Sequence, residues 1–216
     1  MKRVFGLVEA IFNILYLGGA TTIAYYIFLL SNNRVSQLLV VMMAMILVIG
    51  DSFHLVPRII VILTKEEERW RKALGIGKLI TSITMTIFYL ILTYIGILLF
   101  EPENPFLWLF VSYLLVIMRI ILCLMPQNKW IERYPPLSWS IARNIPFFIQ
   151  GMIVSLLFFS YRDSISQLRL LWLAITLSFI FYLPVVLWAN KNPKVGMLML
   201  PKTCIYVWIL TMFLTI

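Results

Sequence analysis

Seven long apolar stretches are the feature that most constrains this chain of 216 residues. An α-helix needs roughly 20 apolar residues to cross the hydrocarbon core of a bilayer, and the stretches are about that long or longer. Backbone polar groups inside a membrane must bond to one another, so such segments form helices. We predict an all-α, polytopic membrane helix bundle with seven transmembrane helices, near residues 4–31, 36–64, 73–100, 106–126, 139–160, 168–190 and 195–216.

The composition agrees with a membrane protein and leaves no room for a soluble domain. Hydrophobic residues make up 62% of the chain and charged residues 12%, whereas soluble domains have roughly 45–50% and 25%. The segments between the apolar stretches are short, so residues 1–216 should form a single integral membrane domain. The first stretch exceeds the roughly 7–15 apolar residues of a secretory signal peptide. We interpret it as the first transmembrane helix.

Basic residues are distributed unevenly between the two sets of loops. Cytoplasmic loops carry an excess of Lys and Arg, which predicts a cytoplasmic N-terminus, an external C-terminus and the plasma (inner) membrane as the location. The same loops explain the formal net charge of +9 without a nucleic-acid partner. One side has ten basic residues and the other has three, namely Lys2, Arg3, Lys65, Arg69, Arg71, Lys72, Lys129, Arg133, Lys191 and Lys194 against Arg34, Arg162 and Arg169.

Ligands for metal or disulfide chemistry are scarce in this sequence. The chain has one histidine and two cysteines, Cys123 and Cys204, and both cysteines lie in apolar stretches. A zinc site needs three or four His, Cys or carboxylate ligands, and a disulfide framework needs more cysteines. We therefore expect no metal site and no cofactor, and we interpret the cysteines as buried thiols.

Eight ionisable side chains lie inside the predicted helices, where a charge costs about 2.5–3.5 kcal/mol at the helix centre. The helix directions place all eight in one half of the membrane, on the cytoplasmic side. If they converge, they form a polar cavity with an excess of cations. Arg and Lys pair strongly with phosphate and carboxylate, so we predict a membrane lipid or another anionic amphiphile as the ligand. The eight residues are Glu9, Asp51, His54, Arg58, Lys78, Arg119, Arg143 and Lys202.

Structural roles are the alternative for several of these groups. Glu9, Lys78 and Arg119 lie near predicted helix ends, from which long side chains can reach the headgroups. Asp51 could instead form an ion pair with Arg58 or Lys202 that only fixes the packing of helices.

The second predicted helix concentrates the unusual residues. Asp51, His54 and Arg58 are related as i, i+3 and i+7, which places them on one face of a helix. Pro57 removes a backbone hydrogen bond and predicts a kink. A carboxyl at this depth is a candidate proton donor. His54 is the other candidate catalytic group, because imidazole titrates close to about pH 6.5 in water.

Parts of two helices resemble the YhhN family, which includes the lysoplasmalogenases. The second helix resembles the family through Gly50, Asp51, Leu55, Pro57 and Arg58. The third helix is similar to a Gly…Ser…aromatic helix of the family through Gly75, Ile76, Gly77, Ser82, Thr86, Ile87, Phe88 and Tyr89. The specific part covers roughly residues 44–93. The chain differs from the family in its seven crossings, and it lacks a Lys-Pro pair on the first helix, a histidine on the third and an acid on the sixth.

The resemblance implies hydrolysis of the vinyl ether bond of a lysoplasmalogen, which gives a fatty aldehyde and a glycerophospho-alcohol. This reaction delivers a proton to carbon, and water then traps the oxocarbenium ion. By its match to the motif, Asp51 would donate the proton. Charge and depth suggest that His54 orients the water or acts as a base, and that Arg58, Arg143 and Lys202 hold the phosphate. Glu9 is the remaining membrane acid that could replace the missing second carboxylate.

Two other functions remain open. A protein that binds or transports an anionic lipid or small metabolite would use the same cavity without chemistry, and the missing second acid favours it. An opsin-like protein would use Lys202, in the sequence Pro201-Lys202-Thr203 on the last helix, as a Schiff-base lysine with Asp51 as the counter-ion. Only the opsin-like protein would absorb visible light after retinal is added.

Overall fold

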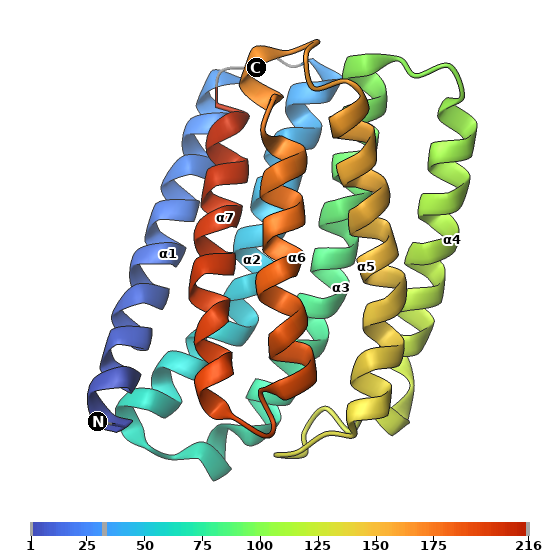
Figure 1. Ribbon diagram of the computed structural model, residues 1–216. Coiled ribbons are helices and arrows are strands. Elements are labelled where there is room, and N and C mark those ends of the chain that lie inside the picture. The colour runs from blue at the N-terminus through green and yellow to red at the C-terminus, as the bar shows by residue number, and fades with distance from the viewer. Residues whose placement is uncertain (1, 32–33, 215–216) are drawn as a thin grey trace.

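The structure is a computed structural model, and it describes residues 2–31 and 34–214. Long helices that run along a common axis make up most of it (Figure 1), and the described residues contain no strand. Three short 3-10 helices lie between them, η1 (Pro126–Asn128), η2 (Ser166–Leu168) and η3 (Pro193–Leu198). The long helices are α1 (Lys2–Leu30), α2 (Val35–Thr64), α3 (Glu67–Phe100), α4 (Pro105–Leu124), α5 (Leu137–Ser160), α6 (Leu171–Trp188) and α7 (Met199–Met212).

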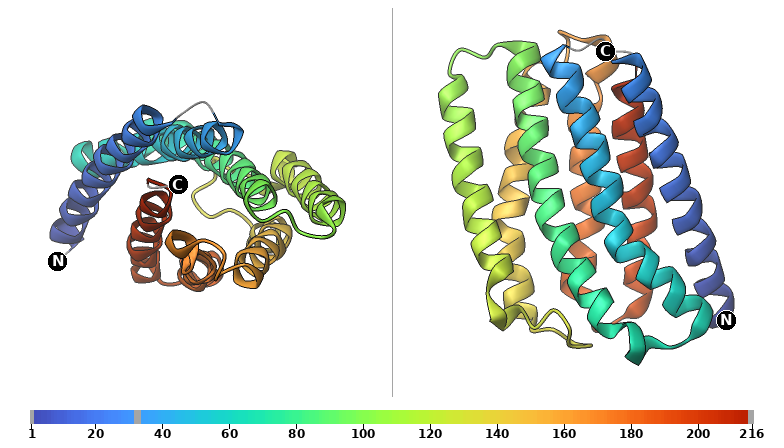
Figure 2. Two further views of the ribbon diagram at one scale, coloured as in Figure 1. Left: turned by 90° about the horizontal axis from the view of Figure 1, so that it is seen from above. Right: turned by 180° about the vertical axis from the view of Figure 1, so that it is seen from behind.

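The helices form a closed ring in which successive helices alternate in direction. Each helix packs against the next one along the chain, α7 packs against α1, and α3 also contacts α5. Figure 2 shows this arrangement from one end and from behind. The two chain termini lie at opposite ends of the bundle (Figure 1). We call the end at which α1 begins the N-terminal end and the opposite end the far end.

The length and surface of the helices are those of a membrane protein. In the described residues, seven segments are long and apolar enough to cross a bilayer, which confirms the predicted number of helices. Large apolar side chains such as Leu15, Phe106 and Ile117 are exposed on the outside of the bundle. In water this surface would favour aggregation, whereas acyl chains can cover it. The chain therefore has the architecture of an integral membrane protein.

Aromatic and branched side chains fill the interior of the bundle. Phe88, Tyr89, Phe158, Ile175 and Ile209 come from α3, α5, α6 and α7, and each is completely buried. The ring of Tyr89 contacts those of Phe88 and Phe147, and that of Phe88 contacts Tyr206. Because this core fills the middle of the bundle, any larger cavity must lie toward one end.

Two helices begin four or more residues away from their predicted starts. Helix α3 begins at Glu67 and not near residue 73, because Glu67 and Glu68 in its first turn suit the positive end of the helix dipole. Lys78 is therefore the twelfth residue of α3 and not about the sixth. Helix α7 begins at Met199, after η3, and not near 195. Residues 215–216, at the predicted end of the last helix, lie outside the described residues.

The part of α2 around Gly50 and Phe53 packs very closely against α3. A Cβ atom on Gly77 would overlap the backbone carbonyl of Phe53, and one on Gly50 would overlap the side chain of Thr84. The Thr81 hydroxyl also donates a hydrogen bond to the Gly50 carbonyl at 2.8 Å. Beyond this crossing, α2 contains Pro57 and bends toward the start of α1 (Figure 2, right). The two glycines thus bring His54 of α2 against the first half of α3.

Replacing Gly77 with alanine should destabilise the bundle, because the new methyl group would overlap backbone that cannot rotate away. We expect Gly77→Ala to lower the free energy of unfolding by about 1–3 kcal/mol, the usual cost of overpacking. The measurement is reversible unfolding in mixed micelles. Gly18→Ala is the matched control, since a Cβ there has no neighbour within 4 Å and alanine favours the helix. Equal stability of the two variants would contradict the close crossing.

Candidate functional site

A cavity of about 280 Å³ lies toward the N-terminal end of the bundle. Its walls come from α2 to α7, and the connection between α4 and α5 contributes Trp130 and Pro135. No residue of α1 lines it among those that the structure describes. Small-molecule sites usually occupy about 300–1,000 Å³, so the cavity can hold a small ligand or the polar head of a larger one.

Four basic side chains from four different helices line this cavity. Lys78 comes from α3, Arg119 from α4, Arg143 from α5 and Lys202 from α7. No Asp or Glu lines the cavity in the part of the chain that the structure describes. The cavity therefore has a concentrated positive charge that no lining carboxylate balances.

Three of the four cations lie over aromatic rings. The guanidinium carbon of Arg119 is 3.3 Å from the centre of the Phe147 ring, and that of Arg143 is 4.1 Å from the Trp130 ring. The Lys202 ammonium is 4.2 Å from the centre of the Tyr182 ring, with Tyr206 also near it at 5.2 Å. Such contacts contribute about 0.5–2 kcal/mol each. Unlike an ion pair, they stabilise a cation without cancelling its charge.

Arg119 is the most deeply buried of these cations. Its side chain is only 2% exposed, and its Nε and Nη1 atoms are buried without a hydrogen-bond partner in the described residues. A buried guanidinium usually pairs with an acceptor, because leaving its N–H groups unpaired costs free energy. An anion in the cavity is the kind of ligand that would stabilise this buried charge.

The loop that follows α4 fixes Arg143 in place. Asn128 is fully buried, and its amide nitrogen donates hydrogen bonds to the carbonyls of Leu122 and Met125, at 2.6 and 2.9 Å. The Asn128 amide oxygen accepts a hydrogen bond of 2.8 Å from Nη1 of Arg143. The indole N–H of Trp130 donates to the Cys123 carbonyl at 2.9 Å. One guanidinium face thus rests on a ring that is itself anchored to the end of α4.

Neutral polar groups complete the cavity wall. The Tyr182 hydroxyl donates to the amide oxygen of Asn144 at 2.9 Å, and the Asn144 amide donates to the Ser140 carbonyl at 2.7 Å. His54 also lines the cavity, and its Nδ1 atom is buried without a hydrogen-bond partner in the described chain. His54 is thus a second residue of the wall that has a buried nitrogen without a hydrogen-bond partner in the described chain.

Asp51 lies beside the cavity and does not line it. The Tyr16 hydroxyl of α1 donates a hydrogen bond of 2.6 Å to the Asp51 carboxylate. Asp51 and Lys202 attract each other electrostatically, although neither is in an ion pair in the described structure. The alternative of a direct ion pair between Asp51 and Arg58 or Lys202 is therefore not what the structure shows.

Arg58 and Glu9 form a pair between α1 and α2. The Arg58 Nε is 2.8 Å from a Glu9 carboxylate oxygen, and neither residue lines the cavity. The Arg58 side chain is 46% exposed, so the pair lies toward the surface of the bundle.

The structure thus brings together five of the eight residues that the sequence singled out. His54, Lys78, Arg119, Arg143 and Lys202 line one cavity. Sequence reasoning missed the aromatic residues and amides that support them. Aromatic side chains are abundant in membrane helices, so their spacing alone carried no signal.

The structure offers little to a metal ion. The described residues contain no group of three or more His, Cys, Asp or Glu side chains close enough to bind one.

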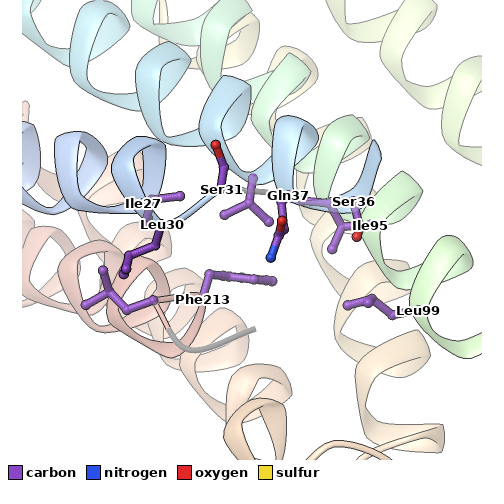
Figure 3. Close-up of a pocket in the computed structure, with 10 residues that line it drawn as sticks. Ile27, Leu30, Ser31, Ser36, Gln37, Ile95, Leu99 and Phe213 are labelled. Atoms are coloured by element: carbon purple, nitrogen blue, oxygen red, sulfur yellow. The ribbon is translucent and has the colours of Figure 1, made fainter. Parts of the chain in front are cut away.

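A second cavity lies at the far end of the bundle and is much smaller. Side chains from the ends of α1 and α3, the start of α2 and the end of α7 surround it (Figure 3). Its volume is about 30 Å³, which is room for about one water molecule. Apolar residues such as Ile27, Leu99 and Phe213 provide most of its wall. The larger cationic cavity is therefore the candidate functional site.

Comparisons with known proteins do not add to this description. No protein-family model, curated protein or solved structure matches the chain.

Proposed function

We propose that this integral membrane protein binds an anionic ligand, the head of an anionic amphiphile or a small anionic metabolite, in its cationic cavity. The observation that carries the proposal is Arg119, which is buried at the cavity wall with two donor atoms unpaired. Three more cations line the same space, and no Asp or Glu among the described residues lines it. A buried charge without an acidic partner is costly, and a bound anion would reduce that cost.

The aromatic contacts support a binding role in a second way. Phe147, Trp130 and Tyr182 hold the cations in position before a ligand arrives. Such preorganisation reduces the entropy that binding must overcome. A surface cluster of flexible lysines would lack this property.

Removal of the Arg119 charge should weaken anion binding without unfolding the protein. We expect Arg119→Met to bind inorganic phosphate at least tenfold more weakly in isothermal titration calorimetry. The variant should be as stable as the wild type or more so, because the charge that is lost has no acid partner. Arg58→Gln is the control, since that arginine lies outside the cavity. Unchanged phosphate affinity in Arg119→Met would contradict the proposal.

Hydrolysis of a lysoplasmalogen is the second candidate function, and it rests on the resemblance of α2 to the YhhN family. One observation favours it, namely that His54 faces the cavity with an unpartnered Nδ1, three residues after Asp51. In this reaction Asp51 would protonate the vinyl ether carbon. His54 would orient the water that traps the cation.

Asp51→Asn separates the two functions. If the protein is a hydrolase, purified protein should release fatty aldehyde from lysoplasmalogen, and the variant should do so about 10²–10⁴-fold more slowly, the usual contribution of a general acid. Ester-linked lysophospholipid should give no aldehyde. Asp163→Asn, at the far end of the bundle, is the control. Absence of aldehyde from wild-type protein that nonetheless binds the lipid would exclude this hydrolase and leave the binding role.

The N-terminal end, where the cavity lies, should face the cytoplasm, and we propose the plasma (inner) membrane as the location. The support is the excess of basic residues in the loops of this end. A reporter enzyme that is active only outside the cytoplasm should therefore be active when fused after Ile216. Activity only when the fusion precedes the first helix would reverse the orientation.

A further inference from the structure

The charge balance of the cavity restricts the ligand beyond a general preference for anions. Asp51 interacts electrostatically with Lys202 and is a partial counter-charge to it. Glu67 acts on Lys78, but Glu67 is already in an ion pair with Arg133, at 3.5 Å. No carboxylate of the described chain is in an ion pair with Arg119 or Arg143. The cavity thus has at least two positive charges, those of Arg119 and Arg143, that no carboxylate of the described chain pairs with.

Singly charged groups cannot neutralise such a site. A carboxylate or a phosphodiester brings one negative charge and would leave a net positive charge in a region of low dielectric constant. A terminal phosphate brings about 1.5 to 2 negative charges at pH 7 and three strong acceptor oxygens. The number of charges therefore favours a phosphomonoester or a diphosphate.

The arrangement of the cations favours a tetrahedral group. Lys78, Arg119, Arg143 and Lys202 approach the cavity from four different helices, so their donors surround the ligand and do not meet it from one side. A planar carboxylate is best matched by a single guanidinium that binds both oxygens in one plane. Oxygens that point in several directions match donors from several helices.

The cavity is also unsuited to a ligand with its own cation. No carboxylate lines it in the described chain. The rings of Phe147, Trp130 and Tyr182, which could otherwise bind an ammonium, already hold Arg119, Arg143 and Lys202. A zwitterionic head such as phosphoethanolamine would bring its ammonium among four positive charges, which is unfavourable.

We propose that the ligand of this cavity ends in a doubly charged phosphoryl group, as in a phosphomonoester or a diphosphate, without an attached ammonium. This inference rests on the proposed anion-binding function and narrows it to one class of ligand. The phosphoryl group can belong to a lipid or to a water-soluble molecule. By this inference, lysoplasmalogens with zwitterionic heads are poor ligands.

The test compares matched ligands that differ in charge. Protein in phosphatidylcholine nanodiscs is titrated with pyrophosphate and glycerol 3-phosphate, and with dimethyl phosphate and acetate, at one ionic strength and pH 7.5. A second arm adds phosphatidic acid or phosphatidylglycerol and measures bound lipid by native mass spectrometry. In at least one arm, we expect a doubly charged ligand to bind at least tenfold more tightly than the singly charged ligands of the same arm. The arm that shows this preference identifies the source of the phosphoryl group, a water-soluble molecule or a lipid.

Variants of cavity residues test whether the preference for doubly charged ligands arises in the cavity. Arg119→Met and Lys202→Met should each reduce the preference for doubly charged ligands at least fivefold, whereas Arg169→Gln at the far end should not change it. Equal affinity for singly and doubly charged ligands would overturn the inference and leave anion binding intact. A preference that survives in both cavity variants would also overturn it. Absence of binding by every anion in both arms would instead reject the proposed function itself.

Discussion

The contact between a buried cation and an aromatic ring is the interaction on which the candidate site depends. Inside a membrane a cation needs a partner, and the usual partner is a carboxylate. Here Arg119, Arg143 and Lys202 rest on rings that also line the cavity. A carboxylate in those places would stabilise the cations equally well but would consume the charge. Rings keep the charge available, which is what a site for an anion requires.

The Gly50–Arg58 segment shows why the fold was easier to predict from the sequence than the site. The seven helices follow from apolar length alone, and the structure confirms them. Positions i, i+3 and i+7 predicted one shared face, yet Asp51 bonds to Tyr16, His54 faces the cavity and Arg58 pairs with Glu9. The rotation and bending of a helix depend on how it packs against its neighbours. The spacing of residues in a single sequence does not predict that packing.

The sequence was enough to predict the basic residues that line the cavity, but not the residues that support them. The high cost of charge in a membrane singled out Lys78, Arg119, Arg143 and Lys202, and the structure places all four around one space. Their supports were not predictable, because Asn128 and Trp130 lie in a connection that reads as an ordinary polar loop. Only the structure shows that Asn128 is buried against the end of α4 and bonds to Arg143.

Binding and hydrolysis place opposite demands on the one carboxylate near the cavity. A binding protein benefits when Asp51 stays outside, because its carboxylate then compensates Lys202 only in part and puts no negative charge on the cavity wall. A hydrolase needs Asp51 in contact with the substrate, because a proton passes to carbon over a short distance. In the structure Tyr16 holds Asp51 on the side of α1, through a hydrogen bond of 2.6 Å. Hydrolysis would therefore require Asp51 to exchange Tyr16 for the substrate, whereas anion binding requires no rearrangement of α1 and α2.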